Sequence, residues 1–328
     1  MIEDSRFKQL NTWIHQEWPE ATIEVASADA SFRRYFRISN QGKTSIAMDA
    51  PPEKEDCSPF VDVTQRLLDA KVHAPHIIRQ DVKQGFLLLE DFGSQPYLDD
   101  LSITTADQLY SDAMQALVNI QKANTDGLPV YDADFLLMEM QIMPEWFLQT
   151  HLAITPTQAE TETINHCFQT IVKKISEQTQ VFVHRDYHSR NLMILDENNP
   201  GVIDYQDAML GPITYDLVSL LRDCYIQWPN DRVEKWALSF KHILEVENSL
   251  LKLSDDTFIE WFDYMGLQRH IKVLGIFARL NHRDGKSNYL NDLPLTLEYM
   301  MNVAKKYEDT MPLYQLFEQW DISKKINA

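Results

Sequence analysis

The feature of this chain that most restricts its fold is a polar loop enclosed by short apolar runs. Residues 184–191 are His-Arg-Asp-Tyr-His-Ser-Arg-Asn, with one apolar run directly before them and another directly after them. A stretch dense in turn formers follows at 196–201, and an apolar pair then returns the chain to Asp204. This pattern predicts a loop that leads into a β-hairpin, with Asp186 and Asn191 at its mouth and Asp204 at the end of the return strand.

These three polar groups match the needs of phosphoryl transfer. One carboxylate accepts or orients the proton of the acceptor hydroxyl, while an amide oxygen and a second carboxylate hold Mg²⁺ on the nucleotide phosphates. We therefore predict that Asp186 is the catalytic base or hydroxyl-positioning group, and that Asn191 and Asp204 are the metal ligands. The alternative is a surface loop with solvated polar residues, but motif, hairpin spacing and following Asp agree.

The composition is that of a soluble globular protein with an acidic surface. Hydrophobic residues make up 44% of the 328 residues and charged residues 24%. The net charge of −19 disfavours binding of nucleic acid or anionic membranes, because it repels phosphate groups. The chain has neither an apolar run near the ~20 residues that span a bilayer nor a signal-peptide pattern at its start, so a cytoplasmic location is expected. No obligate protein partner is implied.

The chain divides into a small β-rich part and a larger helical part. Residues 1–93 combine expected helices at 4–18 and 59–70 with short strands at 31–38, 45–48 and 86–89. A crossover at about 90–94 leads to residues 94–328, for which the apolar periodicity predicts helices over 104–123, 133–152, 156–178, 214–226, 231–251, 255–280 and 293–308. The predicted fold class is α+β with two lobes.

At this point the chain resembles the aminoglycoside phosphotransferase and choline kinase branch of the protein-kinase-like fold. The branch has a His two residues after the catalytic Asp, here His188, and a second Asp on the helix after the metal Asp, here Asp216. Further segments resemble, within that branch, the bacterial anomeric N-acetylmuramate/N-acetylglucosamine kinases of peptidoglycan recycling. Those segments are 28–37, 48–52, 184–191, 206–208, 211–217 and 279–286.

The resemblance implies ATP- and Mg²⁺-dependent phosphorylation of the C1 hydroxyl of a free amino sugar. Two alternatives stay open. One is a kinase for another small hydroxyl compound, such as an aminoglycoside or an amino alcohol, because a polycationic substrate would suit the acidic surface. The other is a degenerate kinase that only binds nucleotide or a partner, because the usual glycines and lysine are missing.

Residues beside the predicted base have two interpretations each. His188 is a candidate for contact with the γ-phosphate or for a structural role, and Arg190 either neutralises the transferred charge or forms an ion pair on the loop. His184 is expected to brace the loop by hydrogen bonds. Asp216 is expected to tie its helix to the loop as an acceptor, and Asp207 lies nearby.

The N-terminal lobe departs from the kinase pattern. The phosphate-covering turn lacks glycine, although small residues such as Ser31 still let backbone N–H groups approach phosphate. The strand that should end in a phosphate-binding lysine ends in Asp49. Arg33 or Arg34 is the candidate replacement cation, and a solvated Arg on an edge strand is the alternative. The crossover residues Glu90 and Phe92 are expected to offer backbone groups to adenine.

Sugar-binding candidates lie in the helical lobe. Trp146 is a candidate to stack on a sugar face, within a stripe of mostly core residues. Arg279, Arg283 and Lys286, with His282, form the densest basic cluster in the chain. Such a cluster captures a carboxylate, or else it complements the dipole at a helix C-terminus.

Overall fold

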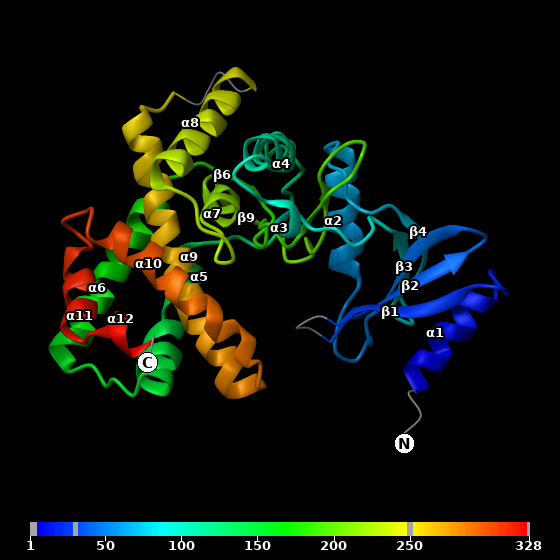
Figure 1. Cartoon of the computed structure of the whole chain (residues 1–328), viewed down its shortest axis with the longest axis horizontal. Helices are drawn as coiled ribbons and strands as arrows, with labels where there is room; N and C mark the ends of the chain where they lie inside the picture. The colour runs from blue at the N-terminus through cyan, green and yellow to red at the C-terminus, as the bar shows by residue number, and fades with distance from the viewer. Residues whose placement is uncertain (1–4, 29–31, 248–251, 327–328) are drawn as a thin grey trace. The chain divides into compact units, whose positions relative to one another are not determined.

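The computed structural model describes residues 5–28, 32–247 and 252–326, which fall into two compact units (Figure 1). The smaller unit contains the residues up to Asp99 together with 191–207, and the larger one contains 100–190 and 208–328. Each unit has its own hydrophobic core.

The smaller unit is built on a five-stranded antiparallel sheet in the order β1-β2-β3-β5-β4. A two-residue turn, Gln41-Gly42, joins β2 to β3 with φ of 49° and 78°, the left-handed pair that matches strand twist in a tight hairpin. The strands are β1 (Thr22–Ala28), β2 (Arg34–Asn40), β3 (Lys43–Asp49), β4 (Ile77–Asp81) and β5 (Phe86–Glu90).

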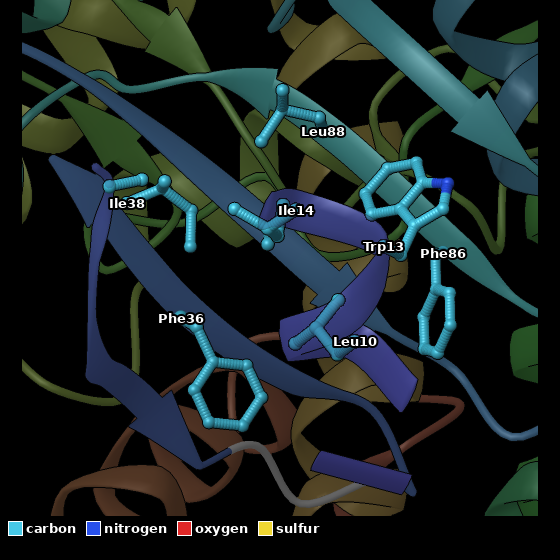
Figure 2. Packing of buried hydrophobic residues seen from close by; sticks show 9 residues of the cluster. Leu10, Trp13, Ile14, Phe36, Ile38, Phe86 and Leu88 are labelled. Carbon is cyan, nitrogen blue, oxygen red and sulfur yellow. The ribbon is translucent and has the colours of Figure 1, made fainter. Parts of the chain in front are cut away.

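Helix α1 (Ser5–His15) covers one face of this sheet. Figure 2 shows Leu10, Trp13 and Ile14 of the helix beside Phe36 and other apolar side chains of the strands. Leu10 and Ile14 are one helical turn apart and almost fully buried, as are Ile38 and Leu88 in the strands. An amphipathic helix with this spacing at the start of the chain was predicted from the sequence, and the structure confirms it.

A short hairpin of β7 (Leu192–Met193) and β8 (Gly201–Val202) belongs to the smaller unit. Its backbone is hydrogen-bonded to that unit, since Val202 N–H donates to His73 O and Ile194 N–H to Gln95 O, both at 2.9 Å. Helix α2 (Ser58–Asp69) contacts the end of the hairpin, where Thr64 Oγ1 and Tyr205 Oη are 2.8 Å apart. The predicted hairpin is therefore confirmed.

The larger unit is mostly helical, with a two-stranded sheet of β6 and β9. Its elements, preceded by α3 (Tyr97–Asp100), are α4 (Ala106–Gln121), α5 (Ala133–Met140), the π-helical η1 (Met143–His151), α6 (Gln158–Ile175), β6 (Gln180–Val183), β9 (Met209–Pro212), α7 (Tyr215–Leu221), α8 (Asn230–Glu247), α9 (Asp255–Asp284), η2 (Ser287–Asp292), α10 (Leu293–Ala304), α11 (Met311–Gln319) and α12 (Ile322–Lys325).

The 30-residue helix α9 is the central element of the larger unit and contacts η1, α6, α7 and α10. Ser254 caps its N-terminus by accepting a hydrogen bond from Thr257 N–H, and Gly285 ends it in the left-handed conformation. At Gly275 the helix lies against the start of η1, where an added Cβ would be 2.6 Å from Ile142 C and Met143 N. A side chain at this position would therefore separate the two helices.

The predicted α+β class with a β-rich N-terminal part and a helical remainder is confirmed. Several helices differ from their predicted extents: α9 continues to Asp284 and α10 ends at Ala304. The helix expected over 133–152 is divided into α5 and η1, with Pro144 in the first turn of η1. The helix expected over 214–226 ends at Leu221. Within the described residues, no helix combines the length and apolarity needed to cross a membrane.

Candidate active site

The backbone of the predicted catalytic loop is held by one buried carboxylate on the neighbouring helix α7. Asp216 Oδ2 accepts a hydrogen bond from His184 N–H at 2.7 Å, and its Oδ1 accepts one from Arg185 N–H at 3.0 Å. Arg185 has φ of 78°, in the left-handed region that residues other than glycine rarely adopt. The two hydrogen bonds stabilise this bend, which is the role that the sequence suggested for Asp216.

Side chains within the loop add to this support. The Asp186 N–H donates to His184 Nδ1 at 3.2 Å, so the His184 ring accepts from the residue that carries the predicted base. Tyr187 is fully buried and donates its hydroxyl to Ala113 O of α4 at 2.8 Å. Further along, Asp223 accepts hydrogen bonds from the backbone and hydroxyl of Ser189. The loop is thus fixed at several points. Such support is needed wherever a side chain must be held in a precise position for catalysis.

Asp186 lies among positive charges. Burial would raise the pKa of its carboxyl group, but His188, Lys272 and Arg269 hold this pKa below its usual value. The carboxylate is therefore ionised at neutral pH and can accept a hydrogen bond from a hydroxyl group. This state suits a residue that orients an acceptor hydroxyl or takes its proton.

His188 and Arg190 differ in their surroundings. Among the described residues, His188 Nδ1 is buried without a hydrogen-bond partner, and its ring meets Tyr225 edge-on at 5.4 Å. Arg190 is exposed, and its guanidinium carbon lies 3.4 Å from the centroid of the Tyr225 ring. Within the described residues Arg190 forms no ion pair with a side chain of the loop. The interpretation of Arg190 as one partner of such an ion pair therefore has no support.

A buried polar network beside the loop was not recognised from the sequence. Glu139 of α5 is 5% exposed and accepts hydrogen bonds from Arg185 at 2.8 Å and from the Tyr131 hydroxyl. Lys272 of α9 donates to Glu139 at 3.4 Å and to Tyr215 Oη at 2.8 Å. The available signal was the presence of charged residues at helical spacing within an otherwise apolar helix, because charges are buried only when they are paired or functional.

The two predicted metal ligands come together in the smaller unit. Asn191 and Asp204 lie at opposite ends of the β7–β8 hairpin, and Asn191 Nδ2 is 3.3 Å from Asp204 Oδ2. The Ile203 N–H also donates to Asn191 O at 3.1 Å, which fixes the register. Gln206 donates to Asp204 Oδ1 at 2.9 Å.

This donor set fits a magnesium ion. Mg²⁺ is commonly bound through one or two carboxylates, with substrate phosphates and water completing its shell. Within the described residues no group of three or more His, Cys, Asp or Glu side chains is suited to a metal. A metal ion that is also bound by the phosphates of a nucleotide does not need such a group. A carboxylate and an amide held side by side by a hairpin are therefore compatible with such a site.

The N-terminal candidates have found protein partners. Asp49, at the end of β3, is fully buried and binds the guanidinium groups of both Arg6 on α1 and Arg34 on β2. Arg33 is 9% exposed. Arg34 begins β2, which lies between β1 and β3, so Arg34 is not on an edge strand, whereas Arg33 precedes the strand. Ser31 lies outside the described residues.

The crossover after β5 is braced by an ion pair. Arg37 Nε lies 2.7 Å from Asp91 Oδ2, and its Nη2 donates to Gly93 O at 2.7 Å. The Glu90 N–H donates to the carbonyl oxygen of His76, the residue before β4, at 2.9 Å. This backbone N–H is therefore already hydrogen-bonded within the smaller unit.

Phe92 is 8% exposed and meets His73 edge-on at 4.8 Å. It also packs on Gly201 of β8, where a Cβ would lie 2.6 Å from the Phe92 ring. A larger residue at position 201 would therefore displace this ring.

The sugar-binding candidates lie on η1 and at the end of α9. Trp146 is half-buried on η1, an element that contacts α9. Arg283 is exposed and pairs with Asp284 at 2.8 Å, so part of the basic cluster is neutralised locally. Arg279 is half-buried, and burial lowers the pKa of its guanidinium. Lys286 follows the glycine that ends the helix.

Comparison with known proteins places these features in a family. The family model described as "Phosphotransferase enzyme family" matches residues 22–249. An N-acetylmuramate/N-acetylglucosamine kinase of Pseudomonas aeruginosa is 42% identical over 332 residues, covering 96% of this chain and 97% of that protein. A protein of the same name from Neisseria meningitidis serogroup B is 38% identical, with 94% of each chain covered.

Solved structures show the same architecture. The ADP-bound aminoglycoside phosphotransferase APH(2'')-Ib has a TM-score of 0.60 at 16% identity, covering 92% of this chain and 99% of that one. The choline kinase LicA from Streptococcus pneumoniae has a TM-score of 0.61 at 12% identity, covering 90% and 99%. At these identities the likeness concerns the fold, and it confirms the predicted kinase-like architecture. With a family model over most of its length and relatives such as the 42% identical one, this chain belongs to the phosphotransferase enzyme family.

Proposed function

We propose that this protein transfers the γ-phosphoryl group of ATP to the C1 hydroxyl of N-acetylmuramate and N-acetylglucosamine. The observation that carries the proposal is the 38–42% identity to proteins named as kinases of these two sugars, over at least 94% of this chain. A place in peptidoglycan recycling inside the cell follows from the same resemblance. The ionised, rigidly held Asp186 supports phosphoryl transfer to a hydroxyl.

In this proposal the acceptor hydroxyl donates its hydrogen bond to Asp186. As the bond from O1 to the γ-phosphorus forms and the bond to the β-phosphate oxygen breaks, the hydroxyl proton passes to that carboxylate and ADP leaves. Asn191 and Asp204 would hold Mg²⁺, which neutralises phosphate charge when bound. His188 and Arg190 supply donors near the transferred group, and Trp146 supplies a surface for the sugar ring.

The nucleotide is expected to meet the smaller unit at the crossover, where Glu90 and Phe92 lie, and at the phosphate-covering turn that the sequence predicts at Ser31. Arg33 and Arg34 remain the candidate cations. Arg34 is paired with Asp49. The carboxylate of N-acetylmuramate would be met by Arg279, Arg283 and Lys286 if the basic cluster is a binding site.

A substrate panel tests the proposal. N-acetylmuramate, N-acetylglucosamine, glucosamine, kanamycin and choline would each be incubated with ATP and Mg²⁺, and the products identified by phosphorus NMR. We expect a sugar 1-phosphate from the first two, which does not reduce alkaline copper because the anomeric carbon is blocked. A reducing sugar phosphate would refute the C1 hydroxyl as the acceptor. Phosphorylation of kanamycin or choline, without phosphorylation of either amino sugar, would refute the proposed substrates.

The metal assignment has a separate test. Asp204→Ala should weaken Mg²⁺-dependent nucleotide binding more than Asn191→Ala does, because a carboxylate is the stronger ligand for a hard cation. Titration of ATP at several Mg²⁺ concentrations, followed by calorimetry, measures the difference. Equal and small effects would place the metal elsewhere.

A further inference from the structure

Arg269 on α9 is a buried cation that makes no hydrogen bond or ion pair to another described residue. Its side chain is 4% exposed, and its Nε is buried without a hydrogen bond. A guanidinium carries five N–H donors. Across the described ranges 5–28, 32–247 and 252–326, however, the close contact of the Arg269 guanidinium is with an aromatic ring: its central carbon lies 5.9 Å from the centroid of the Tyr215 ring. A buried charge without a hydrogen bond is costly unless a ligand pairs with it.

Two carboxylates that act on Arg269, those of Asp216 and Asp223, use their oxygens on other donors. Asp216 accepts from the backbone of His184 and Arg185. Asp223 accepts from Ser189 and, at 3.2 Å, from the N–H of Tyr225. These acids offset the charge of Arg269 without binding its N–H groups, so the fork of donors is left for another acceptor.

A second buried polar atom without a hydrogen-bond partner among the described residues lies on the loop that carries Asp186. His188 Nδ1 is buried and unpartnered within the described residues. The guanidinium of Arg269 lies 5.9 Å from the centroid of the Tyr215 ring, and the next residue, Asp216, accepts from the backbone of His184 and Arg185, so Arg269 lies near the loop that carries Asp186 and His188. Its charge also lowers the pKa of Asp186 and of His188. All three belong to the larger unit, on the loop and on α9. Within the described residues, Arg269 Nε and His188 Nδ1 near the predicted base are thus buried without a hydrogen bond.

We propose that Arg269 binds an oxygen anion of the reactants beside Asp186. The inference rests on the proposed function, and it adds an acceptor-site residue that the basic cluster at the end of α9 does not include. The anion has two possible sources: the carboxylate of N-acetylmuramate, or the phosphoryl group in transfer. A planar guanidinium suits either, because it donates two parallel hydrogen bonds to a carboxylate or phosphate.

The position of Arg269 also separates it from that cluster. Arg279 lies ten residues further along α9, which is about 15 Å along a helix axis. One carboxylate can therefore reach only one of the two arginines. Lys272, one turn after Arg269, is already engaged by Glu139 and Tyr215 and does not compete for the anion.

The test compares Arg269→Gln with Arg269→Lys on both sugars. Charge-assisted hydrogen bonds of this kind correspond to about a 10- to 100-fold change in kcat/KM. We expect a loss of this size for Arg269→Gln and a smaller loss for Arg269→Lys, which keeps the charge without the fork. Arg232→Gln is the matched control, since Arg232 pairs with Asp107 on a different part of the larger unit.

The two sources give different kinetics. A loss confined to N-acetylmuramate and expressed in KM identifies the sugar carboxylate. An equal loss on both sugars, expressed in kcat, identifies the phosphoryl oxygens. In either case the midpoint of thermal unfolding should stay within a few degrees of the wild-type value, because Arg269 makes no hydrogen bond to another described residue that the substitution would break.

Four outcomes would overturn the inference. One is wild-type kinetics of Arg269→Gln on both sugars, and another is a loss of activity that follows a loss of folded protein in both variants. If Arg269→Gln does not fold, unchanged kcat/KM of Arg269→Lys on both sugars has the same meaning. Wild-type protein that phosphorylates neither sugar would refute the proposed substrates and this inference together, whereas the first outcome refutes the inference alone.

Discussion

At the scale of single residues, Asp186 is the side chain on which the proposed chemistry depends. Asp186→Asn keeps the size of the group but removes the charge that accepts the hydroxyl proton. We expect kcat to fall about 10²- to 10⁴-fold, with nucleotide affinity nearly unchanged, because the carboxylate acts on the acceptor. Steady-state kinetics and calorimetric titration of ATP measure the two effects.

The control for this substitution is Asp196→Asn, because Asp196 is exposed in the hairpin turn and the same chemical change there alters only the surface. A variant at Asp186 with near-full kcat would remove this residue from the mechanism.

Asp216 is the residue whose charge is linked to stability. Burial raises the pKa of its carboxyl group from 3.8 to about 7, although two backbone N–H groups oppose this. At a pH between these two pKa values, the Asp216 carboxyl group is protonated in the folded protein and ionised in the unfolded chain. The free energy of unfolding of the wild type should therefore fall, relative to Asp216→Asn, as the pH rises from 4 through 7.

Urea unfolding of both proteins at several pH values between 4 and 8 measures this difference. Asp216→Asn itself should lower stability by about 1–3 kcal/mol, because one of the two loop N–H groups loses its acceptor. A difference between the two proteins that does not vary with pH would show that Asp216 stays ionised throughout the range.

At the scale of elements, the close approach of α9 and η1 depends on Gly275. Gly275→Ala would place a Cβ 2.6 Å from backbone atoms of Ile142 and Met143, which cannot rotate away. We expect a loss of about 1–3 kcal/mol in the free energy of unfolding, measured by urea denaturation, despite the better helix propensity of alanine.

Gly266→Ala is the matched control on the same helix. Its Cβ would approach the end of the Arg222 side chain at 3.0 Å, an atom that can shift, so the loss should be smaller. An equal effect at both positions would mean that helix propensity or flexibility, and not the contact with η1, determines the result.

At the scale of the whole molecule, the net charge of −19 opposes the approach of anions. N-acetylmuramate carries a carboxylate that N-acetylglucosamine lacks, and ATP is common to both reactions. Salt shortens the Debye length from about 30 Å at 0.01 M to about 8 Å at 0.15 M, while a contact with a buried cation is screened much less. The ratio of kcat/KM for N-acetylmuramate to that for N-acetylglucosamine should therefore rise a few-fold over this range.

Initial rates at constant Mg²⁺ and increasing salt measure this ratio, with N-acetylglucosamine as the internal control for effects on ATP. A ratio that falls with salt would show that attraction by exposed basic residues outweighs the long-range repulsion.

The sequence by itself determined the local features of this protein. The loop from His184 to Asn191 and the hairpin that ends at Asp204 were predictable, because turn formers and apolar runs act over a few residues. The amphipathic helix α1 and most of the helices of the larger unit followed from apolar periodicity, which is also a local signal. The role of Asp216 was predictable through a motif at fixed spacing.

Only the tertiary structure decided which distant charges meet. Lys272 and Glu139 are 133 residues apart in the chain, and Arg6 and Asp49 are 43 apart, yet each pair is in contact. No local pattern encodes such pairs, since their partners are chosen by how helices and strands pack. For the same reason the sequence pointed to the basic cluster at the end of α9, whereas the structure points to Arg269, a buried cation whose lack of a hydrogen bond to the described residues becomes visible only once its surroundings are known.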